Sequence, residues 1–277
     1  MNGSGFDLFG GDWCAVVRPD ALAPREGRQY KDMPFQSFQS VVDRVRDLTH
    51  DVRELALRLR EPKEIRFKAG QFISFNLTPP GSERLIIRPY SIASPPDDSK
   101  RITLVFNRVP GGRGSTYLFN LKEGDPVPFE GPQGSFYVRE RTRDVLFVAT
   151  GTGIAPIRSM LSDLMNHGYA GAATLYWGLR SQRDVYYEEE FQALAVRYPN
   201  FSFALALSRP EAGWHAYSGR VTGLVEERVR SVKNVDVFLC GNHAMIRDVT
   251  QIVRTKGLCP IYREIYYDDP TNAAPDY

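Results

Sequence analysis

The chain has 277 residues, 42% of them hydrophobic and 25% charged, which is the composition of a folded protein with one large domain or two ordinary ones. Its 35 lysine and arginine residues against 33 aspartate and glutamate residues leave a formal net charge of +2. That balance excludes a global positive field for recruiting nucleic acid or an anionic membrane.

The three cysteines, Cys14, Cys240 and Cys259, are widely separated, and none belongs to a Cys-x-x-Cys pair. This spacing argues against a disulfide scaffold, a structural zinc site or an iron–sulfur cluster built within this chain. Apolar runs are too short to span a membrane, and the start of the chain does not resemble a signal peptide. We therefore expect a protein of the reducing cytoplasm, with no metal site and no insertion into a membrane.

The first domain is predicted to be an antiparallel β-barrel over residues 35–141, after an irregular extension over residues 1–34. Short segments of alternating polar and apolar residues, separated by turn residues, are typical of such a barrel. They occupy residues 40–45, 52–59, 71–77, 85–87 and 101–106. The segment Pro126–Pro132 is predicted to be a last edge strand, because proline has no N–H to donate within a sheet.

The second domain, residues 142–267, is predicted to be an α/β fold with a doubly wound parallel sheet, followed by a tail over residues 268–277. Continuous apolar strands alternate there with helical patterns, as in strand–helix–strand units. The strands are expected at 144–149, 173–178, 200–207 and 235–241, and the helices at 157–167, 187–197, 221–229 and 243–256.

The short apolar run before Arg88, Pro89, Tyr90 and Ser91 predicts a strand that ends at these residues. Pro89 keeps Arg88 extended, and side chains alternate along an extended chain, so Arg88 and Tyr90 should share one face and Ser91 the other. A guanidinium suits a phosphate and a tyrosine suits a flat ring, so this set fits a cofactor that has both. A strand edge with a surface arginine is the alternative.

A glycine-rich turn, Thr150, Gly151, Thr152 and Gly153, follows the first parallel strand and opens a helix that carries Pro156 in its first turn. The two glycines let backbone N–H groups approach a ligand, and the helix N-terminus favours a diphosphate. In this architecture the position is where a nucleotide binds, although a plain tight turn would also explain it.

Three further segments are ambiguous by themselves. The segment 111–118, with Gly114, Ser115 and Thr116, fits a phosphate loop or a flexible hairpin loop. Cys240 and Gly241 end the fourth parallel strand, where the cysteine fits either beside a substrate or in the core. Glu264–Tyr267 follows the last predicted sheet element, and its alternatives are a proton relay with a ring cover or an exposed final strand.

From about Phe38 to Tyr267 the chain resembles the ferredoxin–NADP reductase family, in the form of bacterial oxygenase reductase components. The resemblance rests on motifs that occur in the family's order. They are Arg88-Pro89-Tyr90-Ser91, Gly114-Ser115-Thr116, Gly151-Thr152-Gly153-Ile154-Ala155-Pro156, Cys240-Gly241 and, at the end, Glu264-Ile265-Tyr266. It implies FAD in the barrel, NADH or NADPH as the co-substrate, and a flavin-dependent oxidoreductase.

The resemblance implies a role for each barrel residue. Tyr90 would stack on the isoalloxazine, Arg88 would bind the diphosphate, and Ser91 would hydrogen-bond near flavin N5. Ser115 and Thr116 would hold the diphosphate from a second loop.

In the second domain, the nicotinamide nucleotide would lie across the turn from Gly151 to Pro156. Cys240 would line the pocket where hydride passes to the flavin, Glu264 would serve the same site, and Tyr266 would cover the far flavin face. These assignments make Ser91, Cys240 and Glu264 the predicted catalytic residues.

The choice between NADH and NADPH stays open. Ser208 and Arg209 follow the third parallel strand, where plant-type members of the family bind the 2′-phosphate, and Arg180 could add a second charge. The segment from Trp214 to Gly223 instead resembles that of NADH-using relatives.

Two features depart from the family pattern. The chain continues past Tyr266, which plant-type members do not, and it shows no clustered cysteines of a fused ferredoxin domain. We therefore expect a separate electron acceptor protein, such as a ferredoxin or an oxygenase component. A free-standing flavin or ferric reductase, and a non-catalytic flavin-binding subunit of a larger complex, remain as alternatives.

Overall fold

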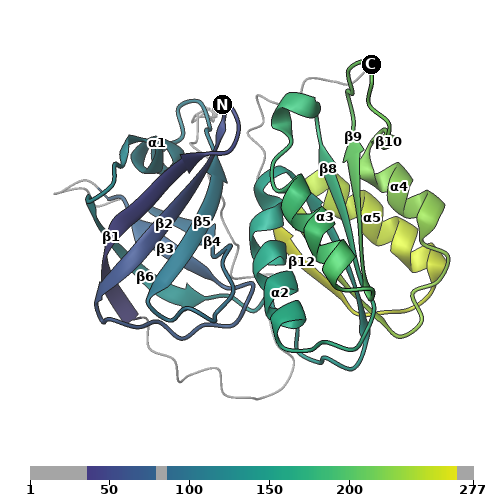
Figure 1. Ribbon diagram of the computed structural model, residues 1–277, viewed down its shortest axis with the longest axis horizontal. Coiled ribbons are helices and arrows are strands. Elements are labelled where there is room, and N and C mark those ends of the chain that lie inside the picture. Colours follow the sequence, from purple (N-terminus) through teal and green to yellow (C-terminus); the bar gives the residue numbers. More distant parts are fainter. Residues whose placement is uncertain (1–35, 79–85, 267–277) are drawn as a thin grey trace, which may run out of the picture.

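The computed structural model describes residues 36–78 and 86–266, which form two sheets side by side (Figure 1). The extension and tail predicted at 1–34 and 268–277 lie outside the described residues, as does Tyr267. An antiparallel sheet with one helix precedes a parallel sheet with helices on both faces. The predicted fold class is therefore confirmed.

The first sheet has six strands in the order β4-β3-β6-β1-β2-β5. A bridge between Ile92, just after β4, and Leu104 of β5 brings the two ends of this order together, so that the sheet closes on itself. Apolar side chains such as Phe38, Leu57 and Ile73 fill its interior. The strands are β1 Gln36–Asp47, β2 Val52–Glu61, β3 Phe72–Asn76, β4 Ile87–Ser91, β5 Arg101–Asn107 and β6 Pro126–Gln133.

The prediction of an edge strand at Pro126–Pro132 was wrong, because β6 lies between β1 and β3. The register explains how a central strand accepts these prolines. Pro126 and Pro128 lie opposite β1 only, whereas pairing with β3 begins near Glu130. In that first half of β6 one side of the strand carries no ladder, so a missing N–H costs little there.

A helix, α1 Arg113–Asn120, occupies the segment that was expected to be a loop between barrel strands. Its sequence includes a glycine, a serine and a threonine, which are weak helix formers. The helix buries Leu118 and Ser115 fully, and Leu118 joins the barrel core. Tertiary burial, rather than local propensity, therefore stabilises it.

The second sheet has the order β10-β9-β8-β7-β11-β12, and all its pairs are parallel. Two separate apolar cores lie on its faces, one shared with α2 and α3 and the other with α4 and α5. Figure 1 shows α2 and α3 in front of the sheet. The strands are β7 Asp144–Thr150, β8 Ala173–Leu179, β9 Phe201–Leu207, β10 Tyr217–Ser218, β11 Val235–Gly241 and β12 Ile261–Ile265. The helices are α2 Ile154–Asn166, α3 Glu188–Arg197, α4 Val221–Arg228 and α5 His243–Lys256.

Strand β10 was not predicted, and β12 was considered only as an exposed final strand at Glu264–Tyr267, whereas it spans Ile261–Ile265 and buries Glu264. β12 pairs with β11 and forms one edge of the sheet, with Glu264 opposite Cys240. This pairing brings the last predicted motif to the carboxyl end of the fourth predicted strand. Among the described residues, no helix combines the length and the apolar character needed to cross a membrane.

The two sheets are joined by direct contacts from α2. The Ser159 hydroxyl donates to the Ser94 carbonyl at 2.6 Å, and the Arg158 guanidinium donates to the Ala93 carbonyl at 3.0 Å. Ala69 and Phe136 of the first domain share a core with Met160 of α2. The helix that begins at the glycine turn is therefore fixed against the chain that follows Ser91.

Candidate active site between the two sheets

Arg88 and Tyr90 lie on one face of β4, as the alternation predicts. A Cβ atom placed on Gly114 would lie 2.5 Å from the Tyr90 hydroxyl and 3.1 Å from Arg88 Cγ, so all three residues meet. The Tyr90 ring is held by Phe75 and Phe106, with ring centroids 5.6 and 5.8 Å away. The first two predicted barrel motifs therefore form one surface.

The N-terminus of α1 faces this surface at Gly114, and the first N–H groups of a helix have no intrahelical acceptor. A glycine there, a guanidinium beside it and a helix N-terminus together fit the diphosphate of FAD. The Ser115 hydroxyl is used differently from the prediction. It is buried and bonds the Val109 and Gly112 carbonyls at 3.1 and 3.2 Å, so it fixes the turn into the helix.

Replacing Gly114 with alanine should weaken flavin retention by about tenfold, because the new methyl group meets the Tyr90 hydroxyl in a packed site. The φ angle of Gly114 is not positive, so alanine adds no backbone strain there that would itself weaken flavin retention. Flavin release during dilution, followed by fluorescence, measures the effect. Unchanged retention in a folded variant would place the cofactor away from α1.

The glycine turn packs directly on the end of β11. A Cβ atom on Gly153 would lie 2.4 Å from the Cys240 carbonyl oxygen, and one on Gly241 would lie 2.1 Å from Thr150 Oγ1. The Thr150 hydroxyl also accepts the Asn242 N–H at 3.1 Å. The predicted nucleotide motif and the predicted Cys-Gly motif are thus neighbours at the carboxyl ends of β7 and β11, the edge where nucleotides bind in such sheets.

Ser91, Glu264, Tyr266 and Cys240 meet at the junction of the two sheets. The Tyr266 hydroxyl donates to Ser91 Oγ at 2.6 Å, and the Ser91 hydroxyl donates to Glu264 Oε1 at 2.7 Å. Cys240 lies directly opposite Glu264 in the pairing of β11 with β12. Three residues of the second domain thus meet one residue of the barrel, although they are far apart in the sequence.

Burial changes the proton affinity of this cluster. It raises the pKa of Glu264 to about 7, and the hydrogen bond from Ser91 has the smaller, opposite effect of lowering that pKa. It also raises the pKa of the fully buried Cys240 thiol well above its usual range, so this residue stays neutral. A carboxyl that titrates near neutral pH, bonded to a hydroxyl, can hold or release a proton at the Ser91 oxygen.

The glycine turn also touches the barrel through Thr152, whose hydroxyl donates to Asn107 Oδ1 at 3.3 Å. Asn107 ends β5, and nothing in its local sequence distinguished it from other polar residues at strand ends. Its contact with the glycine turn could not be found from the sequence, because the two residues are 45 positions apart and meet only in the folded protein.

The three residues predicted near the nucleotide's ribose lie at adjacent strand ends. The Arg209 N–H donates to the Arg180 carbonyl at 2.7 Å, and the Ser208 N–H donates to the Leu179 carbonyl at 3.0 Å. The segments after β8 and β9 therefore present both arginines from one short stretch of paired backbone. That arrangement fits an anionic group on the ribose side of a nucleotide.

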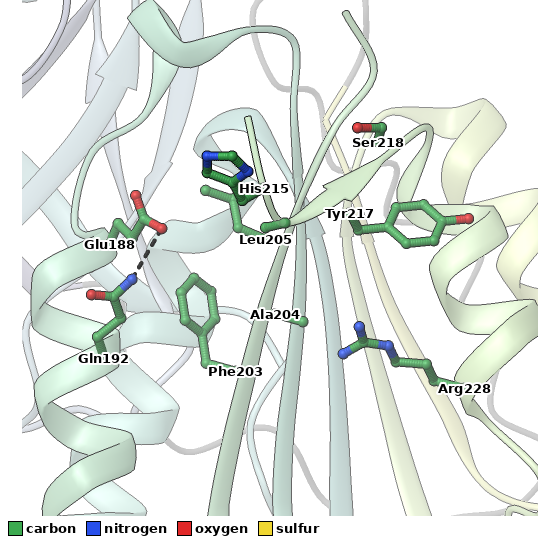
Figure 2. A pocket seen from close by; sticks show the side chains of 10 residues that line it. Glu188, Gln192, Phe203, Ala204, Leu205, His215, Tyr217, Ser218 and Arg228 are labelled. Atoms are coloured by element: carbon green, nitrogen blue, oxygen red, sulfur yellow. Dashed lines mark hydrogen bonds between the residues drawn. The ribbon is translucent and has the colours of Figure 1, made fainter. Parts of the chain in front are cut away.

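A surface hollow of about 610 Å³ lies beside β9, away from the predicted cluster (Figure 2). Figure 2 shows Gln192 and Phe203 on one side of the strand and Arg228 on the other. None of the residues predicted for the site lines it. Its lining residues are Glu188, Gln192, Phe203, Ala204, Leu205, His215, Ala216, Tyr217, Ser218 and Arg228.

Comparison with known proteins agrees with this geometry. Residues 39–137 match the oxidoreductase FAD-binding domain, and residues 147–251 match the oxidoreductase NAD-binding domain. The ferredoxin–NAD(P)+ reductase component of the naphthalene 1,2-dioxygenase and salicylate 5-hydroxylase systems of Ralstonia sp is 34% identical, over 84% of this chain and 70% of the relative. The chain belongs to the ferredoxin–NADP reductase family.

Other members of the ferredoxin–NADP reductase family extend the likeness. Ferredoxin–NADP reductase B of Sorangium cellulosum is 36% identical, over 79% of this chain and 92% of the relative. The crystal structure of the Amycolatopsis cytochrome P450 reductase GcoB superposes with a TM-score of 0.75 at 26% identity, covering 85% of this chain and 71% of that one. This reductase is therefore a flavoprotein oxidoreductase with FAD as cofactor and NADH or NADPH as co-substrate.

Proposed function

We propose that this reductase oxidises a nicotinamide nucleotide beside Ser91 and delivers the electrons, one at a time, to a separate acceptor protein, a ferredoxin or an oxygenase component. The observation that supports this most directly is the contact of Ser91 with Glu264 and Tyr266. This contact joins the last residue of β4 in the barrel to the carboxyl end of β12 in the parallel sheet. Several similar proteins are reductase components of oxygenase systems, which favours a protein acceptor.

FAD, when bound, supplies the redox chemistry by accepting a hydride and passing on single electrons. The chain's own residues bind and orient both partners. Arg88 and the α1 N-terminus are proposed to hold the flavin diphosphate, Tyr90 the ring, and the turn Gly151–Gly153 the nucleotide diphosphate. Cys240 stays a neutral, buried wall of the pocket.

Glu264 is proposed to control the proton at Ser91. The hydrogen bonds run from Tyr266 through Ser91 to the Glu264 carboxyl, so the charge of Glu264 decides whether the Ser91 hydroxyl donates or accepts at the site. Because the pKa of Glu264 lies at about 7, both charge states occur under ordinary working conditions. We also propose that the protein works in the cytoplasm, where free thiols such as Cys240 and Cys259 persist.

An anaerobic titration with NADH and NADPH, followed by mixing with a plant-type ferredoxin, tests this function. We expect a yellow protein that loses its colour with one equivalent of nucleotide and then reduces the ferredoxin rapidly. Arg180 and Arg209 predict tighter binding of the nucleotide that carries a 2′-phosphate, which the two titrations compare. Bleaching without ferredoxin reduction would favour a free-standing flavin reductase. No bleaching with either nucleotide would favour a non-catalytic subunit.

A further inference from the structure

The Gly151 carbonyl, at the start of the glycine turn, accepts hydrogen bonds from two donors. The Trp177 indole N–H donates to it at 3.0 Å, and the Ile154 N–H donates to it where the turn passes into α2. Trp177 lies on β8 opposite Ala149 of β7, which is two residues before Gly151. The indole therefore reaches the turn from the neighbouring strand, although Trp177 and Gly151 are 26 positions apart in the sequence.

The backbone of Gly151 is left-handed, with a φ of +52°. A Cβ atom placed there would have no protein atom within 4 Å apart from its chain neighbours, so the conformation, rather than a lack of space, favours glycine. A turn of this kind directs successive N–H groups to one side and forms a concavity for an anion. The Gly151 carbonyl points away from these N–H groups, because a carbonyl that accepts the Ile154 N–H is directed along the axis of α2.

The Trp177 ring is held in place by other aromatic side chains. It is fully buried, and the rings of Tyr186 and Phe191 meet it at nearly right angles, with centroids 4.8 and 6.0 Å away. The Tyr186 ring lies 5.3 Å from the Tyr187 ring, and the Tyr187 hydroxyl donates to Glu54 of the barrel. The rings of Trp177, Tyr186 and Tyr187 thus form a row between the glycine turn and the barrel wall. In such packing the indole cannot turn away from the glycine turn without displacing its neighbours.

Satisfying a buried tryptophan N–H is the simpler explanation of the bond to Gly151. Two facts favour a further role. The Gly151 carbonyl already has the Ile154 N–H as a donor, so the fold does not need the indole to satisfy it. The peptide that is held is also the one whose orientation decides whether an N–H or a carbonyl oxygen faces an anion at the turn. A carbonyl oxygen in that position would repel the oxygens of a diphosphate.

We propose that Trp177 is a positioning residue for nucleotide binding. Its indole N–H keeps the Gly151 carbonyl directed into α2 and the N–H groups of the glycine turn directed toward the diphosphate of the nucleotide. This inference rests on the proposed function, because it explains how the turn assigned to the nucleotide keeps its binding shape. Trp177 acts through Gly151, so it affects the affinity for the nucleotide and not the hydride step.

The test variant is Trp177→Phe, which removes the indole N–H and keeps an aromatic ring in the row. Phe191→Leu is the matched control, because it also removes ring volume beside a fully buried partner but leaves the indole and its hydrogen bond in place. Tyr186→Phe is a second control. It keeps the ring and removes a buried hydroxyl that has no hydrogen-bond partner among the described residues.

Two measurements separate binding from hydride transfer. Calorimetry with the oxidised, flavin-loaded protein measures the affinity for ADP-ribose, which has the diphosphate but no nicotinamide. Stopped-flow flavin reduction compares NADH and NADPH with 1-benzyl-1,4-dihydronicotinamide, a hydride donor without any phosphate. The second donor reports on the flavin site alone, because the glycine turn has no diphosphate to bind.

We expect Trp177→Phe to bind ADP-ribose about fivefold more weakly, which corresponds to the loss of one hydrogen bond. The NADH or NADPH concentration that gives half-maximal flavin reduction should rise by the same factor. The limiting rate and the rate with 1-benzyl-1,4-dihydronicotinamide should not change. Both control variants should bind ADP-ribose like the wild type.

A second pair of variants, Gly151→Ala and Gly151→Asn, tests the conformation of the turn without any change in the aromatic row. It keeps the proposal testable if Trp177→Phe does not fold. Asparagine tolerates a left-handed backbone better than alanine does, although it is larger. Alanine should therefore weaken ADP-ribose binding more than asparagine, and the reverse order would overturn the proposal.

Unchanged ADP-ribose affinity in a folded Trp177→Phe variant would overturn the positioning role and leave the proposed function intact. An equal loss of affinity in Phe191→Leu would also overturn it, because the loss would then come from packing and not from the hydrogen bond. A wild type that neither nucleotide reduces, but whose ADP-ribose binding weakens as expected in Trp177→Phe, would overturn the proposed function and support the role of Trp177.

Discussion

Replacing Glu264 with glutamine should slow nucleotide oxidation by about 10²-fold and remove the pH dependence of the rate near pH 7. The amide keeps the size of the side chain and can still bond Ser91, but it cannot gain or lose a proton. Single-turnover reduction of the bound flavin by NADH or NADPH, measured from pH 5 to pH 9, checks this. A variant with the same pH profile as the wild type would remove Glu264 from the reaction.

The same substitution should stabilise the folded protein at alkaline pH. Burial raises the pKa of Glu264 from 4.5 to about 7, so the folded state keeps a proton that the unfolded state has released. The wild type therefore loses stability as pH rises from about 4.5 to about 7, by about 3 kcal/mol at most. Glutamine abolishes this loss, so the melting temperatures of the two proteins should agree near pH 4 and diverge above pH 7.

Ser91→Ala provides a matched companion to Glu264→Gln. The Ser91 hydroxyl donates to the carboxylate and so lowers the pKa of Glu264 against the larger effect of burial. Its removal should move the midpoint of the pH profile to a higher pH without abolishing it. A midpoint that moves down, or does not move, would contradict the hydrogen bond between these side chains.

The barrel strands and the four main parallel strands could be predicted because their apolar patterns are local. The same holds for the common face of Arg88 and Tyr90, which follows from the alternation of side chains along a strand. The turn at Gly151–Gly153 was equally visible, since glycines after an apolar strand have a direct steric meaning. Each of these predictions needed only residues adjacent in the sequence.

The strand β12 could not be predicted in the same way. Its sequence, Ile261–Ile265, alternates polar and apolar residues only weakly, and it forms by pairing with β11, which ends 20 positions earlier. Glu264 is buried because of this pairing, which its local sequence does not reveal. The position of β6 in the middle of the sheet and the helix α1 were missed for a related reason, since tertiary pairing and burial overcame poor local propensity.

Arg158→Met is the substitution outside the predicted motifs for which we expect the largest effect. The Arg158 guanidinium donates to both carboxylate oxygens of Glu190, at 2.7 and 3.1 Å, and to the Ala93 carbonyl at 3.0 Å. It also lies 4.6 Å from the centre of the Tyr187 ring, and the Tyr187 hydroxyl donates to the buried Glu54 of the barrel. One side chain of α2 thus joins the chain after Ser91, the helix α3 and, through Tyr187, the barrel wall.

We expect the Arg158→Met variant to lose about 2 kcal/mol of stability, because Glu190 and the Ala93 carbonyl lose their shared partner in a half-buried place. Hydride transfer should slow by at least about tenfold with little change in nucleotide KM. Methionine leaves the glycine turn intact but loosens α2 against the residues after Ser91, and reactions of this kind are sensitive to shifts of about 1 Å. Single-turnover flavin reduction separates these two parameters.

Arg141→Met is the control for this prediction, because it removes an ion pair of the same helix but leaves the contacts of α2 with Ala93 and Ser94 in place. Arg141 donates to Asp163 at 2.6 Å, but its own side chain is 45% exposed, and exposed pairs contribute about 1 kcal/mol or less. This variant should react like the wild type. If both variants, or neither, slowed hydride transfer, the contact of Arg158 with the Ala93 carbonyl would not set the geometry. If only Arg158→Met slows hydride transfer, then Arg158 positions the two predicted motifs although it belongs to neither. It would do so by fixing the distance between the strand that ends at Ser91 and the helix that follows Gly153.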